Sequence, residues 1–310
     1  MIESEPADPW VASVDGAPRV LPVWATLPVA VVAAAVIVVA GRFVGGWADI
    51  SVGRVLPEGR WRELAQTAVF TLVIFLPLAA VAVAATRFEG RSAWLADRHL
   101  PAWAGLSTVL GIGGFSLAIG LAALAGVVVP GAGGPTGAAA LVGVVGGLVL
   151  FGIQAGAEEV YFRGWLQPVL CARWGPMAGL VVTSLLFALL HVAGGARSGL
   201  ALANLFLGGL FFGLLAIRTG GLWAPFLAHL GWNWVEACGF GLEPNPGLGP
   251  TGALVDLDVA GWGLWSGGAD RMNGSLASSL VLLVLVIGLT CFGRNPLLRS
   301  GGLRSAADRG

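Results

Sequence analysis

The sequence predicts an all-α fold, a polytopic transmembrane helical bundle of about eight spans. Of its 310 residues, 56% are hydrophobic and only 11% are charged, whereas soluble domains carry roughly 25% charged residues. Apolar runs recur along the chain, and a membrane-spanning helix needs about 20 such residues. The runs are too long for strands and lack a period of two. In lipid, a helix satisfies the hydrogen bonds of its own backbone, so we expect these runs to be helices.

The spans are expected in eight places, and short turns join the fourth to the seventh, which makes those four antiparallel neighbours. The expected spans are 21–41, 66–86, a glycine-rich span within 103–129, a span from about 137 to the glutamates at 158 and 159, then 176–193, 199–217, 222–240 and 275–293. A straight helix from 137 to 171 would be about 52 Å long. That length exceeds the bilayer, so we expect a break or tilt near Gly164 or Pro168.

One membrane domain is expected over 21–293, between an acidic tail at 1–20 and an arginine-bearing tail at 294–310. The loop 241–274 is long, acidic and rich in Gly, Pro and Trp, so we expect it outside the membrane. With eight spans both termini lie on one side. Arginines favour the cytoplasm for that side, ten against six. The Ala-, Gly- and Arg-rich composition favours a bacterial cell membrane.

The net charge disfavours a nucleic-acid partner, and the cysteine spacing disfavours a disulfide framework or a cysteine metal site. The net charge is zero, so no basic footprint for nucleic acid exists. Cys171, Cys238 and Cys291 are scattered without CxxC spacing, and we expect them to be small packing residues. The lipid bilayer is the expected partner, and nothing in the pattern indicates an oligomeric state.

Few ionisable residues lie inside the expected spans, and such residues are functional candidates by default. They are Glu158, Glu159, Arg163, His191, His229 and Glu236, with the neutral Asn204 and Asn233. Asn204 is interpreted as an interhelical packing residue, and Glu236 as either an interfacial helix end or a partner of the site. The GxxxG spacings Gly152/Gly156 and Gly209/Gly213 are interpreted as helix-packing positions.

The two adjacent glutamates are expected to face different ways. Glu159 and Arg163 are four residues apart and can pair. Glu158 is rotated from Glu159 by about 100° around the helix. We therefore interpret Glu159 and Arg163 as an ion pair that orients the fourth span, while Glu158 stays available for chemistry.

The remaining polar residues repeat at four-residue spacing and can reach one level of the bundle. Phe187 and His191 are i and i+4, as are His229 and Asn233. Glu158 lies 16 residues before residue 174 and His191 lies 17 after it, so an antiparallel hairpin brings both to one depth. His229 and Asn233 lie roughly 14–20 Å into their span. We expect these four side chains to converge.

At these residues the chain resembles the CPBP family, the CAAX proteases and bacteriocin-processing enzymes (also called Abi), to which the type II CAAX prenyl endopeptidases belong. The family motifs are EExxxR, FxxxH and Hxxx[ND]. They match Glu158 to Arg163, Phe187 to His191 and His229 to Asn233, in the family's order and on three separate spans. The resemblance covers about 137–240, which is therefore the expected protease core.

The resemblance implies an intramembrane endopeptidase that hydrolyses a peptide bond of a membrane-associated peptide or protein. It assigns water activation to Glu158 and His191, and stabilisation of the oxyanion to His229 and Asn233. Peptide hydrolysis needs these functions together with a leaving-group acid, and the residue types can supply them. In a bacterium, a bacteriocin leader or a membrane-protein tail is a more natural substrate than a prenylated protein.

Supporting roles fall to Glu159, Arg163 and Phe187, and no cofactor is expected. The alternative within the enzyme interpretation is a zinc ion held by His191, His229 and Glu158, although HExxH is absent. Two other classes stay open. Intramembrane Glu, His and Arg also build proton-coupled transporters, but no repeat between the halves is found. The chain could also be a catalytically silent interaction or immunity protein.

Overall fold

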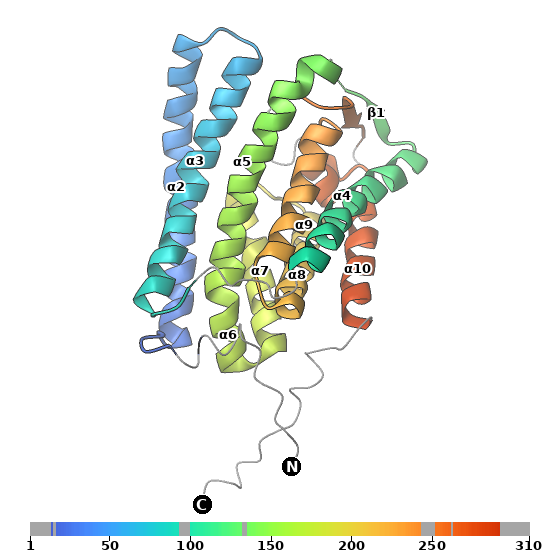
Figure 1. Cartoon of the computed structure of the whole chain (residues 1–310). Coiled ribbons are helices and arrows are strands. Elements are labelled where there is room, and N and C mark those ends of the chain that lie inside the picture. Colours follow the sequence, from blue (N-terminus) through green and yellow to red (C-terminus); the bar gives the residue numbers. More distant parts are fainter. Residues whose placement is uncertain are drawn as a thin grey trace, which may run out of the picture.

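The computed structural model describes residues 14, 17–92, 100–131, 135–242, 252–261 and 263–291. Within them the protein is a bundle of long helices with one small two-stranded sheet (Figure 1). The elements are α2 (Val23–Val55), α3 (Arg60–Phe88), α4 (Leu100–Leu124), β1 (Val128–Pro130), η1 (Gly137–Ala140), α5 (Leu141–Glu159), η2 (Val160–Leu166), α6 (Gln167–Trp174), α7 (Pro176–Gly194), α8 (Gly199–Thr219), α9 (Trp223–Trp234), η3 (Val235–Gly239), β2 (Leu257–Val259), η4 (Gly268–Gly274) and α10 (Leu276–Cys291).

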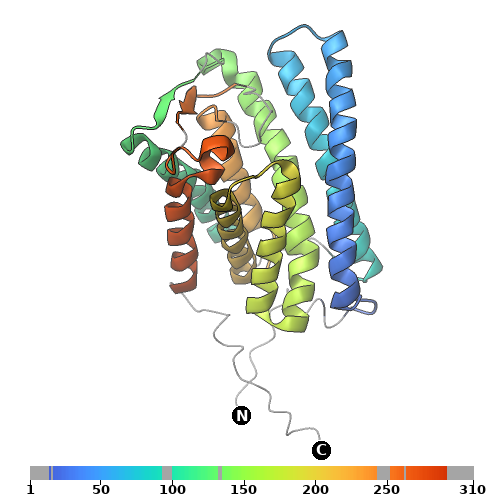
Figure 2. The ribbon, with the colours of Figure 1, turned by 180° about the vertical axis from the view of Figure 1, so that it is seen from behind.

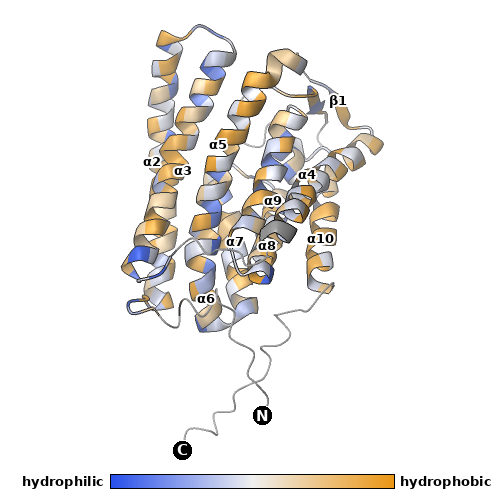
Figure 3. Cartoon of the chain, viewed as in Figure 1, coloured by the Kyte–Doolittle hydropathy of each residue, from blue (hydrophilic) through white to orange (hydrophobic). Residues whose placement is uncertain are grey.

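Seven helical stretches of the described chain are long and apolar enough to cross a membrane, which confirms the all-α polytopic bundle. The span expected at 222–240 is formed by α9 and η3, which together are shorter than the other seven. Hydrophobic residues, orange in Figure 3, run along the helices. Outward side chains such as Val32, Val36 and Phe43 of α2 are exposed. Apolar surface of this extent marks contact with a membrane.

The first two helices extend far beyond the spans expected at 21–41 and 66–86. α2 has 33 residues and α3 has 29, so α2 is about 50 Å long, against a hydrocarbon core of about 30 Å. Apolar composition located the spans, but backbone hydrogen bonding continues the helices through polar sequence. In that polar part, a hydrogen bond from the Gln66 amide to the Asp49 carboxylate joins the two helices.

The helix does not break near Gly164 or Pro168, so that alternative is wrong, and the other alternative, a tilt of this helix in the membrane, stays a prediction. Residues Val160–Leu166 form a π-helix, and α6 continues directly from it with Pro168 in its first turn, a position that proline tolerates. The chain reverses instead at Gly175, whose φ of 88° suits glycine, and Pro176 then begins α7. Helical geometry therefore runs from Gly137 to Trp174.

α5 lies between the α2–α3 hairpin on one side and α9 on the other, as the two opposite views show (Figures 1 and 2). α4 crosses α9 obliquely and also packs on α10. Tyr161, Phe162 and Trp165 fill the core beside α2 and α3. Phe115 and Trp232 fill a second core beside α10. These cores fix α5 and α9, the two helices that carry most of the polar motif residues.

The loop expected outside the membrane at 241–274 packs onto the helices where it is described. β2 pairs antiparallel with β1, with Val259 opposite Val128. In η4, the Asp270 carboxylate accepts the backbone N–H groups of Arg197 and Ser198 at 3.0 and 2.8 Å, at the start of α8. The tails expected at 1–20 and 294–310 lie almost wholly outside the described residues. The start of α2 and the end of α10 lie at one end of the bundle (Figure 1).

Candidate active site

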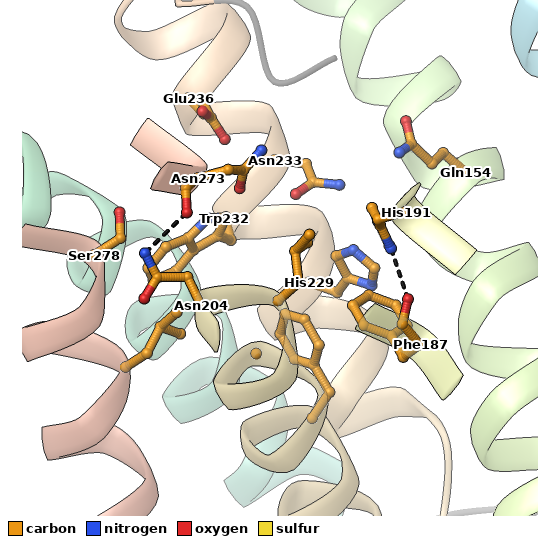
Figure 4. A pocket seen from close by; sticks show the side chains of 14 residues that line it. Gln154, Phe187, His191, Asn204, His229, Trp232, Asn233, Glu236, Asn273 and Ser278 are labelled. Carbon is orange, nitrogen blue, oxygen red and sulfur yellow. Dashed lines mark hydrogen bonds between the residues drawn. The ribbon is translucent and has the colours of Figure 1, made fainter. Parts of the chain in front are cut away.

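A small polar cavity lies where the motif-bearing helices meet. Its volume is about 60 Å³, which is enough for several water molecules. His191, His229 and Asn233 line it, as Figure 4 shows, together with Gln154, Glu236 and Asn273. Three of the four residues expected to converge therefore share one cavity.

Glu158 reaches this group through His229 rather than through the cavity lining. Its Oε2 lies 3.8 Å from His229 Nε2, which is within the range of an ion pair but too long for a direct hydrogen bond. That oxygen is buried and has no hydrogen-bond partner within the described residues. The structure gives no direct hydrogen bond between Glu158 and His191. Glu158 thus offers an unused acceptor beside an imidazole.

Glu159 pairs with Arg163, as expected, and also contacts the site, which was not expected. Its Oε1 accepts from Arg163 Nη1 at 2.9 Å and from His229 Nδ1 at 2.8 Å. The first contact is the i, i+4 ion pair within one helical segment. The second joins residues that are 70 positions apart. One carboxylate therefore fixes both the α5–η2 segment and the imidazole of α9.

Arg163 is completely buried and anchors the motif helix to α8. Its Nη2 donates to the backbone carbonyl of Gly209 at 3.0 Å. Its guanidinium carbon lies 4.9 Å from the ring centre of Phe187 and 5.6 Å from that of Phe212. A guanidinium over aromatic faces gains cation–π stabilisation. Phe187 therefore supports the site by holding Arg163.

The His229 ring is fixed in one orientation. It stacks on Phe212 with ring centres 4.4 Å apart and an interplanar angle of 17°. We assign the proton on Nδ1 from its contact with the Glu159 carboxylate. Nε2 then points toward Glu158.

The His191 ring is fixed by its own helix. Its Nδ1 lies 2.8 Å from the backbone carbonyl of Phe187 (dashed line in Figure 4). Because the carbonyl only accepts, Nδ1 carries the proton of the neutral ring, and Nε2 is left as an acceptor. The ring centre of Phe187 lies 4.7 Å from His191 and 6.0 Å from His229, so this phenylalanine contacts both histidines.

The buried charges near the site nearly balance. Arg163, Glu158 and Glu159 are each at most 4% exposed, and buried charges are stable only when they are paired. With all three ionised, the group has one net negative charge. A second proton on His229 would neutralise it and would turn Nε2 into a donor.

The structure gives no ready ligand set for the zinc alternative. Among the described residues, no three His, Cys, Asp or Glu side chains lie together in a way that could hold a metal ion. His229 Nδ1 binds Glu159, and its Nε2 lies 3.8 Å from Glu158. A histidine that is held by a carboxylate at one nitrogen can bind a metal with the other, so His229 by itself does not decide between zinc and a metal-free site.

Sequence reasoning missed several polar residues of the cavity. Gln154 precedes Glu158 by four residues, so the same helical spacing could have identified it. Asn273 comes from the long loop and carried no such signal. It is held there by Asn204, whose Nδ2 donates to the carbonyls of Asn273 and Ser275 at 2.8 and 2.9 Å. Asn204 also accepts from Ser279 of α10, which confirms its interhelical role.

Only one of the two expected GxxxG spacings supports close packing at both positions. A methyl group on Gly209 would lie 2.9 Å from Ser184 of α7, and one on Gly213 would lie 2.5 Å from Leu180. Gly152, in contrast, has open space around it. Cys171 and Cys238 are buried, as expected for packing residues, whereas Cys291 is exposed, so that expectation is wrong for the third cysteine.

The segment that carries the three motifs is similar to a known protein family. Residues 138–235 match the family described as type II CAAX prenyl endopeptidase Rce1-like. The match contains all three motifs. This part of the chain is therefore similar to the Rce1-like family. This Rce1-like segment runs from η1 to the first residue of η3, so it carries the whole hydrogen-bonded group of Glu159, Arg163 and His229.

One curated protein is similar to part of this chain. The chain is 39% identical over 85 residues to an "Uncharacterized 24.3 kDa protein" of Escherichia coli. The match covers 27% of this chain and 38% of that protein. No solved structure matches the chain.

Proposed function

We propose that this protein is an intramembrane endopeptidase that hydrolyses a peptide bond of a membrane-associated peptide or protein. The observation that carries the proposal is the buried Glu158 Oε2, which has no hydrogen-bond partner in the described chain and lies 3.8 Å from His229 Nε2. The adjoining cavity is also lined by His191 and Asn233. The Rce1-like match over these residues supports the same reaction class.

In the proposed mechanism, Glu158 and the free Nε2 of His191 hold the attacking water between them. Glu158 takes its proton as the oxygen attacks the peptide carbonyl, and later returns that proton to the leaving amine. General acid–base catalysis of this kind contributes about 10²–10⁴-fold.

His229 and Asn233 act on the carbonyl oxygen. With Nδ1–H held by Glu159, a protonated His229 directs Nε2–H at the oxygen that gains charge. The Asn233 amide, one turn along α9, supplies a second donor. Fixed donors aimed at a developing oxyanion are often the largest catalytic contribution. We propose that no metal takes part.

The test is hydrolysis of a quenched fluorescent peptide by the purified protein in lipid vesicles. Glu158→Gln keeps the shape of the side chain but cannot take a proton, so we expect its rate to fall by at least about 100-fold. Glu58→Gln, at the exposed α2–α3 turn, is the matched control and should keep the wild-type rate. Dialysis against a strong chelator should leave the wild-type rate unchanged.

Three outcomes would contradict the proposal. Normal turnover by Glu158→Gln would remove its proposed base. Loss of activity on chelation, with recovery on adding zinc, would overturn the metal-free mechanism. Proton-coupled uptake without any cleavage would identify a transporter instead.

A further inference from the structure

Glu236 is a buried carboxyl of the cavity that the proposed mechanism does not use. It is 2% exposed, and its Oε1 has no hydrogen-bond partner within the described residues. It lines the same cavity as His191, His229 and Asn233, and Figure 4 shows it near Asn233 and Asn273. It lies in η3, a π-helical segment that directly follows α9. Such segments occur frequently at functional sites.

The other buried carboxylates of the described chain have partners nearby. Glu159 binds Arg163 and His229, and Glu89 binds Arg91 and Trp165. Asp270 accepts two backbone N–H groups. Glu158 has His229 at 3.8 Å. A buried carboxyl oxygen without a hydrogen-bond partner is costly. Because the described residues offer Glu236 Oε1 no partner, we infer that a group that enters the cavity supplies one.

The cavity walls indicate what that group is. Among the described residues that line the cavity there is no arginine or lysine, and Glu236 is the one carboxyl. A substrate carboxylate would therefore find no cation there and would meet an acid. A positively charged side chain would find an acceptor, and charge-assisted hydrogen bonds are about twice as strong as neutral ones.

We propose that Glu236 is a specificity-determining residue, which binds a basic side chain of the substrate close to the peptide bond that is cut. This inference rests on the proposed function. Glu236 lies three residues after Asn233, a rise of about 4.5 Å along the helix. The basic residue is therefore within two positions of the scissile bond.

The experiment is a peptide series that needs no mutation. One membrane-anchored quenched peptide is varied to Arg, Lys, Gln or Glu at each of the two positions on either side of the cut. We expect Arg or Lys to exceed Gln in kcat/KM by about tenfold at one position, with Glu below Gln there. Equal rates for all four residues at every position would overturn the inference.

A variant then ties the preference to this side chain. In Glu236→Gln, the ratio of kcat/KM for the basic and Gln peptides should fall to about one. The exposed Glu58→Gln control should keep the wild-type ratio. A basic preference that is unchanged in Glu236→Gln would overturn the assignment.

Failure of the two proposals can be distinguished. Cleavage that depends on Glu158 but ignores substrate charge overturns the role of Glu236 alone. If the wild-type protein cleaves no peptide of the series, the proposed function fails and this inference fails with it.

Discussion

Glu158 and Glu159 are adjacent in the chain and both lie near His229, yet their hydrogen bonding differs. Glu159 Oε1 receives two hydrogen bonds, from Arg163 and His229, whereas Glu158 receives none within the described residues, and the Oε2 atom of each is buried without a partner. Removing one partner of a buried ion pair leaves an uncompensated charge, which is strongly destabilising. Substitution of Glu158 by glutamine breaks no such hydrogen-bonded ion pair. We therefore expect the same substitution to destabilise the protein at Glu159 and not at Glu158.

We expect Glu159→Gln to lower the free energy of unfolding by about 3 kcal/mol, because Arg163 loses its buried counter-charge. Glu158→Gln should leave it unchanged within error. Thermal unfolding in detergent, followed by tryptophan fluorescence, measures both. Equal stability of the two variants would contradict the conclusion that Glu159 stabilises the fold through Arg163 and His229.

Much of the site could be predicted at the residue scale. Helical spacing paired Glu159 with Arg163, and the depth of each span brought His191, His229 and Asn233 to one cavity. The bond between Glu159 and His229 could not be predicted, because it depends on how α5 and α9 rotate about their axes. Sequence spacing placed Glu159 in an ion pair with Arg163, but for the same reason it could not show that Glu159 also contacts His229.

At the scale of elements, the close approach of α7 and α8 positions Arg163. Arg163 donates to the carbonyl of Gly209, and Gly209 itself lies against Ser184. The sequence identified Gly209 and Gly152 by the same GxxxG spacing and gave no means to separate them. Which face of each helix meets a neighbour is decided by tertiary packing.

A matched pair of substitutions tests this contact. In Gly209→Ala the added methyl group would lie 2.9 Å from Ser184, and overpacking of this kind costs typically about 1–3 kcal/mol. Gly152→Ala should be neutral or slightly stabilising, because nothing lies within 4 Å of its added methyl. Unfolding temperatures of the two purified variants are the measurement. An unfolding temperature of Gly209→Ala equal to or above that of the wild type would contradict the close approach of Gly209 to Ser184.

For the whole molecule, the number and order of helices could be predicted from apolar runs, but their ends could not. Hydropathy reports where lipid begins and ends, whereas a helix continues as long as its backbone bonds are satisfied. α2 and α3 therefore run well past the expected limits at residues 41 and 66. The packing of η4 on α8 was equally hidden, since it depends on the distant contact of Asp270 with Arg197 and Ser198.

The arrangement of the helices predicts the topology of the protein in a membrane. The start of α2 and the end of α10 lie at one end of the bundle, and the turn at 56–59 lies at the other (Figure 1). We expect epitope tags on both termini to be protected together when protease is added outside intact bacterial cells. A tag inserted after Glu58 should be cut. Digestion of one terminal tag alone would contradict the arrangement. Digestion of both tags would show that the protein has the opposite orientation in the membrane.

The length of the α2–α3 hairpin has a practical consequence for imaging. A 31.6 kDa membrane protein has little mass outside a detergent micelle by which particle images can be aligned. Because α2 exceeds the hydrocarbon thickness by about 20 Å, the hairpin forms a stiff handle beyond the micelle. An antibody fragment bound at residues 56–59 would be carried on two continuous helices, at a distance from the polar cavity, and would serve as a fiducial for cryo-electron microscopy.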